Sequence, residues 1–204
     1  MASSTGATTV ADSSVLARIT DSSDSSVGGG SAAALAGSMA ASLAAMVARL
    51  SESGAFGLAP EQCRALAVEG DSLSRQLLQG AEEDAQAYGL LAAAYRRTQT
   101  GPESARARDA AIQRAAIVAA TVPRDNARMS RRVLELCDQL EGRSNSNACS
   151  DLAVARVLAD AALSGCVLNI VVNLPLIHDA ALANELSQEA TRLRATTSPE
   201  PEAG

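Results

Sequence analysis

The sequence is poor in aromatic residues, and it contains neither tryptophan nor lysine. Its 204 residues are 47% hydrophobic but only 1% aromatic, and its 17 basic residues are all arginine. A core of alanine, leucine and valine has little bulk per residue, so its elements must approach closely, as α-helices do. Ala, Leu, Arg, Glu and Gln are also strong helix formers. Because β-branched runs long enough for several strands are absent, an all-α fold is predicted.

The net charge and the spacing of the cysteines argue against nucleic acid and metal ions as partners. The net charge is −6, and no basic stripe is interleaved with aromatic residues, so no nucleic-acid partner is expected. The cysteines form no CxxC pair and His178 is the only histidine, so no metal site is expected. We predict that the cysteines are buried free thiols: Cys63, Cys137, Cys149 and Cys166. The N-terminus lacks a basic start followed by an apolar run, and a cytoplasmic location is expected.

The segment from Ala32 to Ala48 contains no charged residue, and its length is about the lower limit for a membrane span. Its residues are mostly Ala, Ser and Gly, which are only weakly apolar, and nothing later in the chain resembles a second span. A helix enclosed by other helices explains this composition better, so no membrane partner is expected.

Hydrophobic spacing predicts one helical domain over residues 10–196, between a disordered N-terminus at 1–9 and a disordered tail at 197–204. The expected helices cover residues 10–20, 31–50, 61–97, 103–140, 151–173 and 179–194. Pro123 lies inside one of them and should kink it or split it in two. Because the connecting turns are short, an up-and-down bundle of long helices is predicted.

Three consecutive glycines, Gly28, Gly29 and Gly30, precede Ser31 at the start of the first core helix. Glycines at a helix start let the backbone approach a ligand, and the unpaired N–H groups of the first turn attract negative or carbonyl oxygen. Ser31 can add a hydroxyl to such a site or cap the helix. A flexible connector followed by a cap is an equally good interpretation of the same residues.

Polar residues also occur on helices that should be partly buried. Asp84 and Tyr88 are four residues apart and share a face, as do Asn169 and Asn173 in a very apolar run. A buried amide is costly unless it is hydrogen-bonded, so the asparagines either brace the bundle or bind a polar heterocycle. Asp84 can instead be a solvated acid, and Asp151 a helix cap.

Geometry separates two of these candidates. Asp151 and Asn169 share a face of one helix, but they lie about 27 Å apart along it. One small site in one chain cannot contain both residues. Either there are two ligand regions, or two subunits bring opposite ends of this helix together.

Five stretches, taken in order, resemble the cyclodeaminase/cyclohydrolase family. This family comprises stand-alone methenyltetrahydrofolate cyclohydrolases and the cyclodeaminase half of formiminotransferase-cyclodeaminase. The stretches are GGGSAAALAG (28–37), EEDAQAY (82–88), Thr121-Val122-Pro123, NSNACSD (145–151) and NIVVNLPLIHD (169–179). The similarity runs from about residue 10 to residue 195.

The resemblance implies a helical homodimer that forms through its helices and acts on a tetrahydrofolate derivative without a bound prosthetic group or metal. It implies Asp84 and Asp151 as acid/base or cation-stabilising groups. It also implies a substrate site at Gly28, Gly29, Gly30, Ser31, Tyr88, Asn145, Asn147, Asn169 and Asn173. Since the chain has no lysine, a folate tail would need arginine, with Arg124, Arg128, Arg131 and Arg143 as candidates.

The expected activity is hydrolysis of the one-carbon bridge of 5,10-methenyltetrahydrofolate, because the chain carries no formiminotransferase half. A formiminotetrahydrofolate cyclodeaminase is the alternative. Val27 and Ser144 depart from the family pattern, which leaves open a repurposed enzyme acting on a non-folate heterocycle. A non-catalytic, ligand-binding helical dimer is an alternative of another class.

Overall fold

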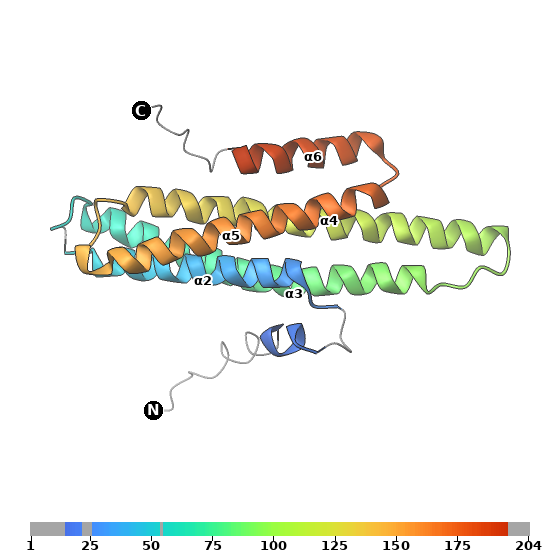
Figure 1. The fold of residues 1–204 in the computed structure, drawn as a ribbon, viewed down its shortest axis with the longest axis horizontal. Helices are drawn as coiled ribbons and strands as arrows, with labels where there is room; N and C mark the ends of the chain where they lie inside the picture. The colour runs from blue at the N-terminus through green and yellow to red at the C-terminus, as the bar shows by residue number, and fades with distance from the viewer. Residues whose placement is uncertain (1–14, 22–25, 54, 196–204) are drawn as a thin grey trace, which may run out of the picture.

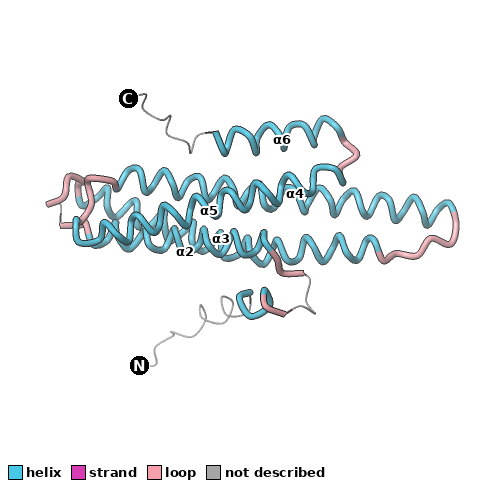
Figure 2. Tube along the Cα trace, viewed as in Figure 1, coloured by secondary structure: helices cyan, strands magenta, loops and turns pink. Residues whose placement is uncertain are grey.

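The computed structural model describes residues 15–21, 26–53 and 55–195, which form a bundle of long helices (Figure 1). In chain order the elements are α2 (Gly29–Leu50), α3 (Pro60–Tyr95), α4 (Pro102–Leu140), η1 (Ser146–Ala148), α5 (Cys149–Asn173), η2 (Leu174–Leu176) and α6 (Ala180–Ala195), where η marks a short 3-10 helix. Residues 15–19 add a short helical segment, and the described part of the chain contains no β-strand (Figure 2). The all-α prediction is confirmed. The segments predicted to be disordered, 1–9 and 197–204, lie outside the described residues.

The five core and C-terminal helices begin and end within two residues of the predicted positions. The expected short helix at residues 10–20 is described only from Val15 onward. Helix α4 runs without interruption through Pro123, so of the two predicted outcomes, a kink or a split, the split does not occur. Proline removes one intrahelical hydrogen bond, to the carbonyl of Ala119. That carbonyl accepts a hydrogen bond from the Asn173 side chain instead.

Helix α2 lies at the centre of the bundle and contacts α3, α4 and α5. Most of its buried residues are alanine, glycine or serine, and small residues on the facing helices let the backbones approach. A Cβ added at Gly70 of α3 would lie 2.9 Å from the Cβ of Ala45, closer than such atoms come in practice. The prediction that other helices enclose this segment is confirmed.

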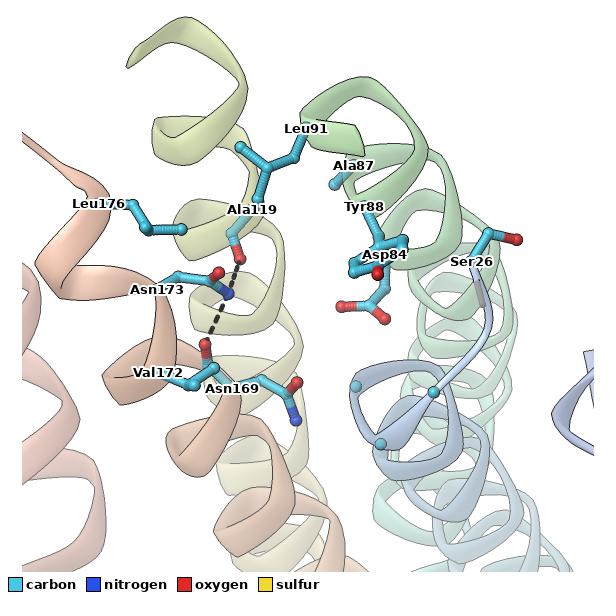
Figure 3. Close-up of a pocket in the computed structure, with 13 residues that line it drawn as sticks. Ser26, Asp84, Ala87, Tyr88, Leu91, Ala119, Asn169, Val172, Asn173 and Leu176 are labelled. Atoms are coloured by element: carbon cyan, nitrogen blue, oxygen red, sulfur yellow. Dashed lines mark hydrogen bonds between the residues drawn. The ribbon is translucent and has the colours of Figure 1, made fainter. Parts of the chain in front are cut away.

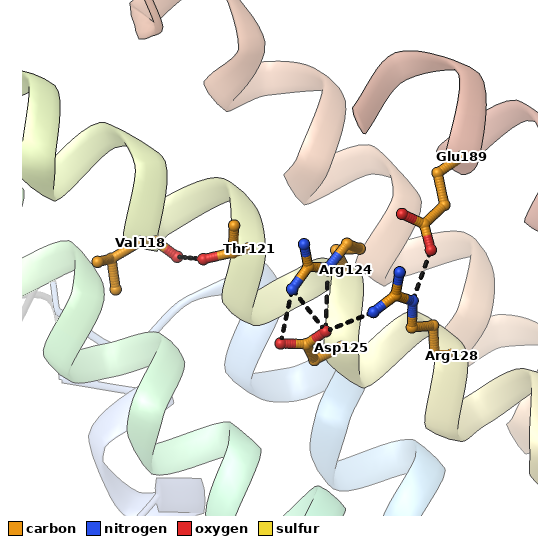
Figure 4. A network of polar contacts seen from close by, with 6 residues as sticks. All are labelled: Val118, Thr121, Arg124, Asp125, Arg128 and Glu189. Carbon is orange, nitrogen blue, oxygen red and sulfur yellow. Dashed lines mark hydrogen bonds and ion pairs between the residues drawn. The ribbon is translucent and has the colours of Figure 1, made fainter. Parts of the chain in front are cut away.

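Helix α6 lies along the outside of α4 and α5. Its buried residues are Leu186 and Ala190. Arg128 of α4 donates a hydrogen bond of 2.5 Å to Glu189 of α6, and it also pairs with Asp125 on its own helix (Figure 4). Ion pairs this exposed typically contribute less than about 1 kcal/mol each. Apolar packing therefore holds α6 in place, and the ion pair fixes its register.

Two helices are long and apolar enough to cross a membrane by length and composition alone, Gly29–Leu50 and the segment Ser146–Leu176 around α5. The expectation that nothing after the first core helix resembles a second span is therefore wrong. Leucines and valines give the second segment a mean hydropathy of 1.8. The bundle buries 67% of the first window but only 33% of the second, so α5 has an exposed apolar surface.

The cysteine prediction is correct at three positions and wrong at one. All four thiols are free, and Cys63, Cys137 and Cys166 are buried, whereas Cys149 is exposed. Cys149 begins α5 beside the loop that precedes the helix, and it faces away from the core. Among the described residues, no three His, Cys, Asp or Glu side chains are grouped so as to hold a metal ion.

Helices α3 and α4 are longer than their neighbours and continue beyond them as a two-helix hairpin (Figure 1). Ser31, at the start of α2, lies opposite Asp84 of α3. Asn173, at the end of α5, lies opposite Ala119 of α4. Residues 87–118 therefore project past the point where α2 begins and α5 ends.

Candidate functional site

A cavity of about 390 Å³ opens at the base of this hairpin, where the start of α2 and the end of α5 face α3 and α4 (Figure 3). Its lining combines polar groups with small and apolar side chains: Ser26, Gly28, Gly29, Gly30, Asp84, Ala87, Tyr88, Leu91, Ala119, Asn169, Val172, Asn173 and Leu176. The volume lies within the range of small-molecule sites. The segments that supply this lining are up to about 150 residues apart in the chain, and the bundle brings them together.

The glycine segment forms one wall of the cavity. Gly28 is the N-cap of α2, and no side chain caps the helix there. The N–H groups at the start of the first helical turn carry partial positive charge, and Gly29 and Gly30 of this turn line the cavity. A Cβ added at Gly30 would lie 2.3 Å from Oδ1 of Asp84, whereas one added at Gly28 would meet nothing within 4 Å. Gly30 is therefore required for the position of the carboxylate.

Asp84 is the carboxylate that the described residues contribute to the lining. Ser31 Oγ donates to Oδ2 of Asp84 at 3.0 Å, and the backbone N–H of Ser31 also bonds this carboxylate. The serine thus orients the acid rather than capping its own helix. Burial raises the pKa of Asp84 above its usual value, and the hydrogen bonds from Ser31 oppose that rise only in part. Among the described residues no arginine pairs with it, so the site favours a positively charged ligand.

Asn173 forms the opposite wall through two hydrogen bonds. Its Nδ2 donates to the carbonyl of Ala119 at 2.9 Å and to that of Asn169 at 2.8 Å (Figure 3). The Ala119 carbonyl is free to accept because Pro123, four residues later, has no N–H. The proline in α4 and the asparagine in α5 therefore act as a pair that links the two helices beside the cavity.

The amide groups of Asn169 and Asn173 are oriented by these contacts. The Nδ2 of Asn169 donates to the carbonyl of Gly165 at 2.9 Å, and the Nδ2 of Asn173 is also committed to backbone carbonyls. Each side-chain oxygen therefore remains available as an acceptor, since an amide has one oxygen and one nitrogen end. Together with Asp84 they can accept hydrogen bonds from the N–H groups of a flat heterocycle.

Tyr88 stands at the mouth of the cavity and is 45% exposed. Ala87 and Leu91 lie beside it on α3, and Val172 at the end of α5 and Leu176 in η2 also line the cavity. The site is thus an apolar slot with one carboxylate on one side and two amide oxygens on the other. Such a slot suits a planar, delocalised cation, because the acid can offset its charge in a poorly solvated environment.

The structure places three predicted site residues elsewhere. Asp151 lies in the first turn of α5, and Asn145 and Asn147 lie in the preceding loop, at the opposite end of the bundle from the cavity. Asn145 holds this loop against α2, because its N–H donates to Ser51 Oγ at 2.9 Å and its Nδ2 to the Leu50 carbonyl at 3.2 Å. A second cavity of about 340 Å³ includes Asn145.

None of the four arginines proposed for a folate tail lines the cavity. Arg124 and Arg128 pair with Asp125, Arg131 with Glu135, and Arg143 donates to the carbonyl of Gln139. Sequence reasoning also missed the apolar lining of the slot. Leu91 follows Asp84 and Tyr88 at helical spacing, which is the signal that would have placed it on their face.

Comparisons with known proteins agree with this architecture. The formiminotransferase-cyclodeaminase family matches the chain over residues 14–192. The methenyltetrahydrofolate cyclohydrolase of Methylorubrum extorquens is 33% identical over 169 residues, which are 82% of this chain and 81% of that protein. The crystal structure of formiminotetrahydrofolate cyclodeaminase from Thermotoga maritima has the same fold, with a TM-score of 0.74 at 23% identity over 83% of this chain and 81% of the other. By the extent of these matches, the chain belongs to the formiminotransferase-cyclodeaminase family.

Proposed function

We propose that the protein is a methenyltetrahydrofolate cyclohydrolase, an enzyme that hydrolyses the one-carbon bridge of 5,10-methenyltetrahydrofolate. The observation that carries the proposal is the partly buried carboxylate of Asp84, which faces the slot and pairs with no arginine among the described residues. The methenyl substrate is a flat amidinium cation fused to a pterin, so its charge matches that carboxylate. The similarity to a methenyltetrahydrofolate cyclohydrolase over most of both chains supports the same activity.

In the proposed reaction, water adds to the methenyl carbon between N5 and N10. Asp84 orients the water and accepts its proton, and the raised pKa of Asp84 makes it a better base than an ordinary aspartate. The adduct then collapses as one C–N bond breaks, which leaves a formyl group on one nitrogen and a proton on the other. Asn169 and Asn173 hold the pterin ring through their amide oxygens, and the glycine segment lies against it.

An absorbance assay tests this function directly, since hydrolysis removes the conjugated methenyl chromophore. We expect the purified protein to accelerate this loss, and Asp84→Asn to abolish most of the acceleration. A parallel assay with formiminotetrahydrofolate measures ammonia release. Release of ammonia without methenyl hydrolysis would identify a cyclodeaminase instead, and inactivity in both assays would contradict the proposed function.

The protein is also proposed to act as a homodimer that forms through α5. Exposed apolar residues repeat along one face of this helix, with spacings of three, four and seven: Val154, Val157, Ala161, Leu168, Val171 and Val172. This face runs from the loop end to the cavity end, and Asp160, three residues after Val157, is the charged residue at its edge. An apolar face of that length is unusual on a monomer and suits a second copy of the same helix.

Charge favours an antiparallel arrangement of the two copies. The projecting hairpin, residues 87–118, has five arginines and two acids, whereas residues 138–160, at the other end, have four acids and two arginines. Antiparallel pairing about the middle of α5 brings these ends of opposite charge together. It also brings Asp151 of one copy beside the end of α5 in the other, where Asn169 and Asn173 line the cavity. Asp151, Asn145 and Asn147 can therefore contribute to a site that two subunits share.

A complementation experiment tests the shared site. Asp84→Asn and Asp151→Asn homodimers should both be impaired, but dimers that contain one chain of each kind carry one intact Asp84–Asp151 pair and should regain activity. Leu168→Arg should yield a monomer in sedimentation analysis with much lower activity. Failure of the mixed dimers to regain activity would show that each site uses one chain only, and a fully active monomer would refute the dimer.

A further inference from the structure

The chain has three aromatic residues, and two of them are exposed on the hairpin that projects beyond the cavity. Tyr88 and Tyr95 are 45% and 44% exposed, so each presents much of its side chain to solvent. Asp84, Tyr88, Leu91 and Tyr95 follow one another at spacings of four, three and four, so they lie on one face of α3. The two tyrosines thus extend the cavity wall outward along the hairpin.

Arg108 of α4 completes this surface at its outer end. Its guanidinium carbon lies 5.7 Å from the centre of the Tyr95 ring, in cation–π geometry. Its Nε and Nη2 donate to the Tyr95 carbonyl at 3.3 Å and 3.0 Å, which holds the side chain in place. A guanidinium has five N–H donors, so others remain for a ligand. Among the described residues the contacts of Arg108 are with Tyr95, and no acidic side chain pairs with it.

From these observations we infer that Tyr88, Tyr95 and Arg108 form a subsite for the benzoyl-glutamate tail of the folate substrate. This inference rests on the proposed function. With the one-carbon bridge at Asp84, Tyr88 is about one helical turn away, about 6 Å along α3, and Tyr95 about 16 Å away. The benzoyl ring is attached to the reacting ring and reaches the level of Tyr88, on which it stacks. The glutamate carboxylates, at the far end of the tail, reach the guanidinium of Arg108.

The direction of side chains on a helix supports this placement of the benzoyl ring near Tyr88 and of the carboxylates near Arg108. Helical side chains lean toward the N-terminus of their own helix, so the Tyr95 ring leans back over the turn that leads to Tyr88 and the cavity. Arginine binds carboxylates through two parallel hydrogen bonds, which a neutral side chain cannot replace. The subsite therefore recognises an aromatic carboxylate tail that takes no part in the reaction at Asp84.

The test compares two substrates in the same absorbance assay: 5,10-methenyltetrahydrofolate and the corresponding methenyltetrahydropteroate, which lacks the glutamate. Arg108→Gln should raise KM for the folate about tenfold or more, as expected for loss of a charged hydrogen bond, with kcat unchanged. It should leave KM for the pteroate unchanged. Arg114→Gln is the matched control, since Arg114 lies on the same helix but lines a different groove, beside Leu90 and Val118.

Tyr95→Leu provides a second test, because it removes the ring and its contact with Arg108 but leaves the backbone carbonyl that Arg108 binds. It should raise KM for the folate by a smaller factor than Arg108→Gln, with an unchanged thermal unfolding midpoint. Equal KM values for Arg108→Gln and the wild-type protein, or equal changes for both substrates, would overturn the subsite. Wild-type protein that hydrolyses neither substrate would instead refute the proposed function.

Discussion

The two ends of α5 carry the same kinds of polar residue in different surroundings. At the end of the helix, Asn169 and Asn173 face a cavity that also contains Asp84 and the start of α2. At its beginning, Asp151 follows a loop in which Asn145 bonds to the backbone and to Ser51 at the end of α2. Two asparagines and an aspartate occur at each end, but only one end encloses the acid within an apolar slot.

The difference shows that neighbours from other helices, rather than residue type, decide what a polar side chain does. The pKa of Asp84 is raised because burial in the slot disfavours its charge, and Gly30 leaves the space in which it is buried. Asn145 binds main-chain groups at a turn, which is a common structural role for asparagine. Within a single chain, the cavity end surrounds its carboxylate with other helices, whereas Asn145 at the loop end holds the main chain in place.

Replacement of Asp84, at the cavity end, should have the largest effect on activity. We expect Asp84→Asn to lower kcat for methenyltetrahydrofolate hydrolysis by about 100-fold or more, because the amide cannot accept the proton of the attacking water. Circular dichroism should show unchanged helicity, since Asn can still bond to Ser31. Steady-state kinetics with the same substrate measures the effect. Retention of wild-type kcat would remove Asp84 from the mechanism.

Gly30→Ala tests whether the glycine segment positions that acid. The new Cβ would fall 2.3 Å from Oδ1, so the carboxylate must move, and displacement of a catalytic group by about an ångström costs on the order of 100-fold or less. Gly28→Ala is the control, because no atom lies within 4 Å of its added Cβ. If both variants reduced kcat equally, backbone flexibility rather than room for Asp84 would explain the glycines.

Asn173→Ala should destabilise the cavity end more than Asn145→Ala destabilises the loop end. Without Asn173, the buried Ala119 carbonyl loses its donor, and an unsatisfied buried group costs about 1–3 kcal/mol in the free energy of unfolding. Asn145→Ala removes the donor to the Leu50 carbonyl, which lies near solvent, so it should lower the free energy of unfolding by only about 1 kcal/mol. Urea unfolding measures both changes.

Pro123 allows a sharper version of this experiment, because its missing N–H leaves the Ala119 carbonyl free to bond to Asn173. Pro123→Ala restores an N–H that can bond to the Ala119 carbonyl within α4. In the Asn173→Ala background this second change should therefore recover stability, whereas alone it should have little effect. A double-mutant cycle that shows additive changes would mean that the proline and the asparagine are not coupled.

This pair also illustrates how far the sequence alone can predict the molecule. Helix positions follow from local spacing and turn residues, so the bounds of α2 to α6 were predictable within two residues. The effect of Pro123 was not, because the donor that compensates for it comes from Asn173, fifty residues later in the chain. The local pattern marked Asp84, Tyr88, Asn169 and Asn173 as candidates, but their meeting in one cavity depends on helix register.

A weaker effect of Asp84 should appear in the pH dependence of the free energy of unfolding. The raised pKa of Asp84 means that the folded state holds its proton to higher pH than the unfolded state does. Asp84 thus contributes a stabilisation that is fully present below its unfolded pKa, about 4, and is lost as pH rises through its folded pKa. Asp84→Asn removes this loss, so the variant should gain stability relative to the wild-type protein as pH rises.

Urea unfolding between about pH 4 and pH 7.5 measures this difference. The buried thiols of Cys137 and Cys166 do not interfere, because burial raises the pKa of Cys137 to about 11 and that of Cys166 to about 12. Asp151→Asn serves as the matched Asp-to-Asn replacement at the loop end of α5. If the free energies of unfolding of Asp84→Asn and of the wild-type protein changed in parallel with pH, Asp84 would be as well solvated as a surface acid. The slot would then lack the poorly solvated charge on which recognition of a cationic ring depends.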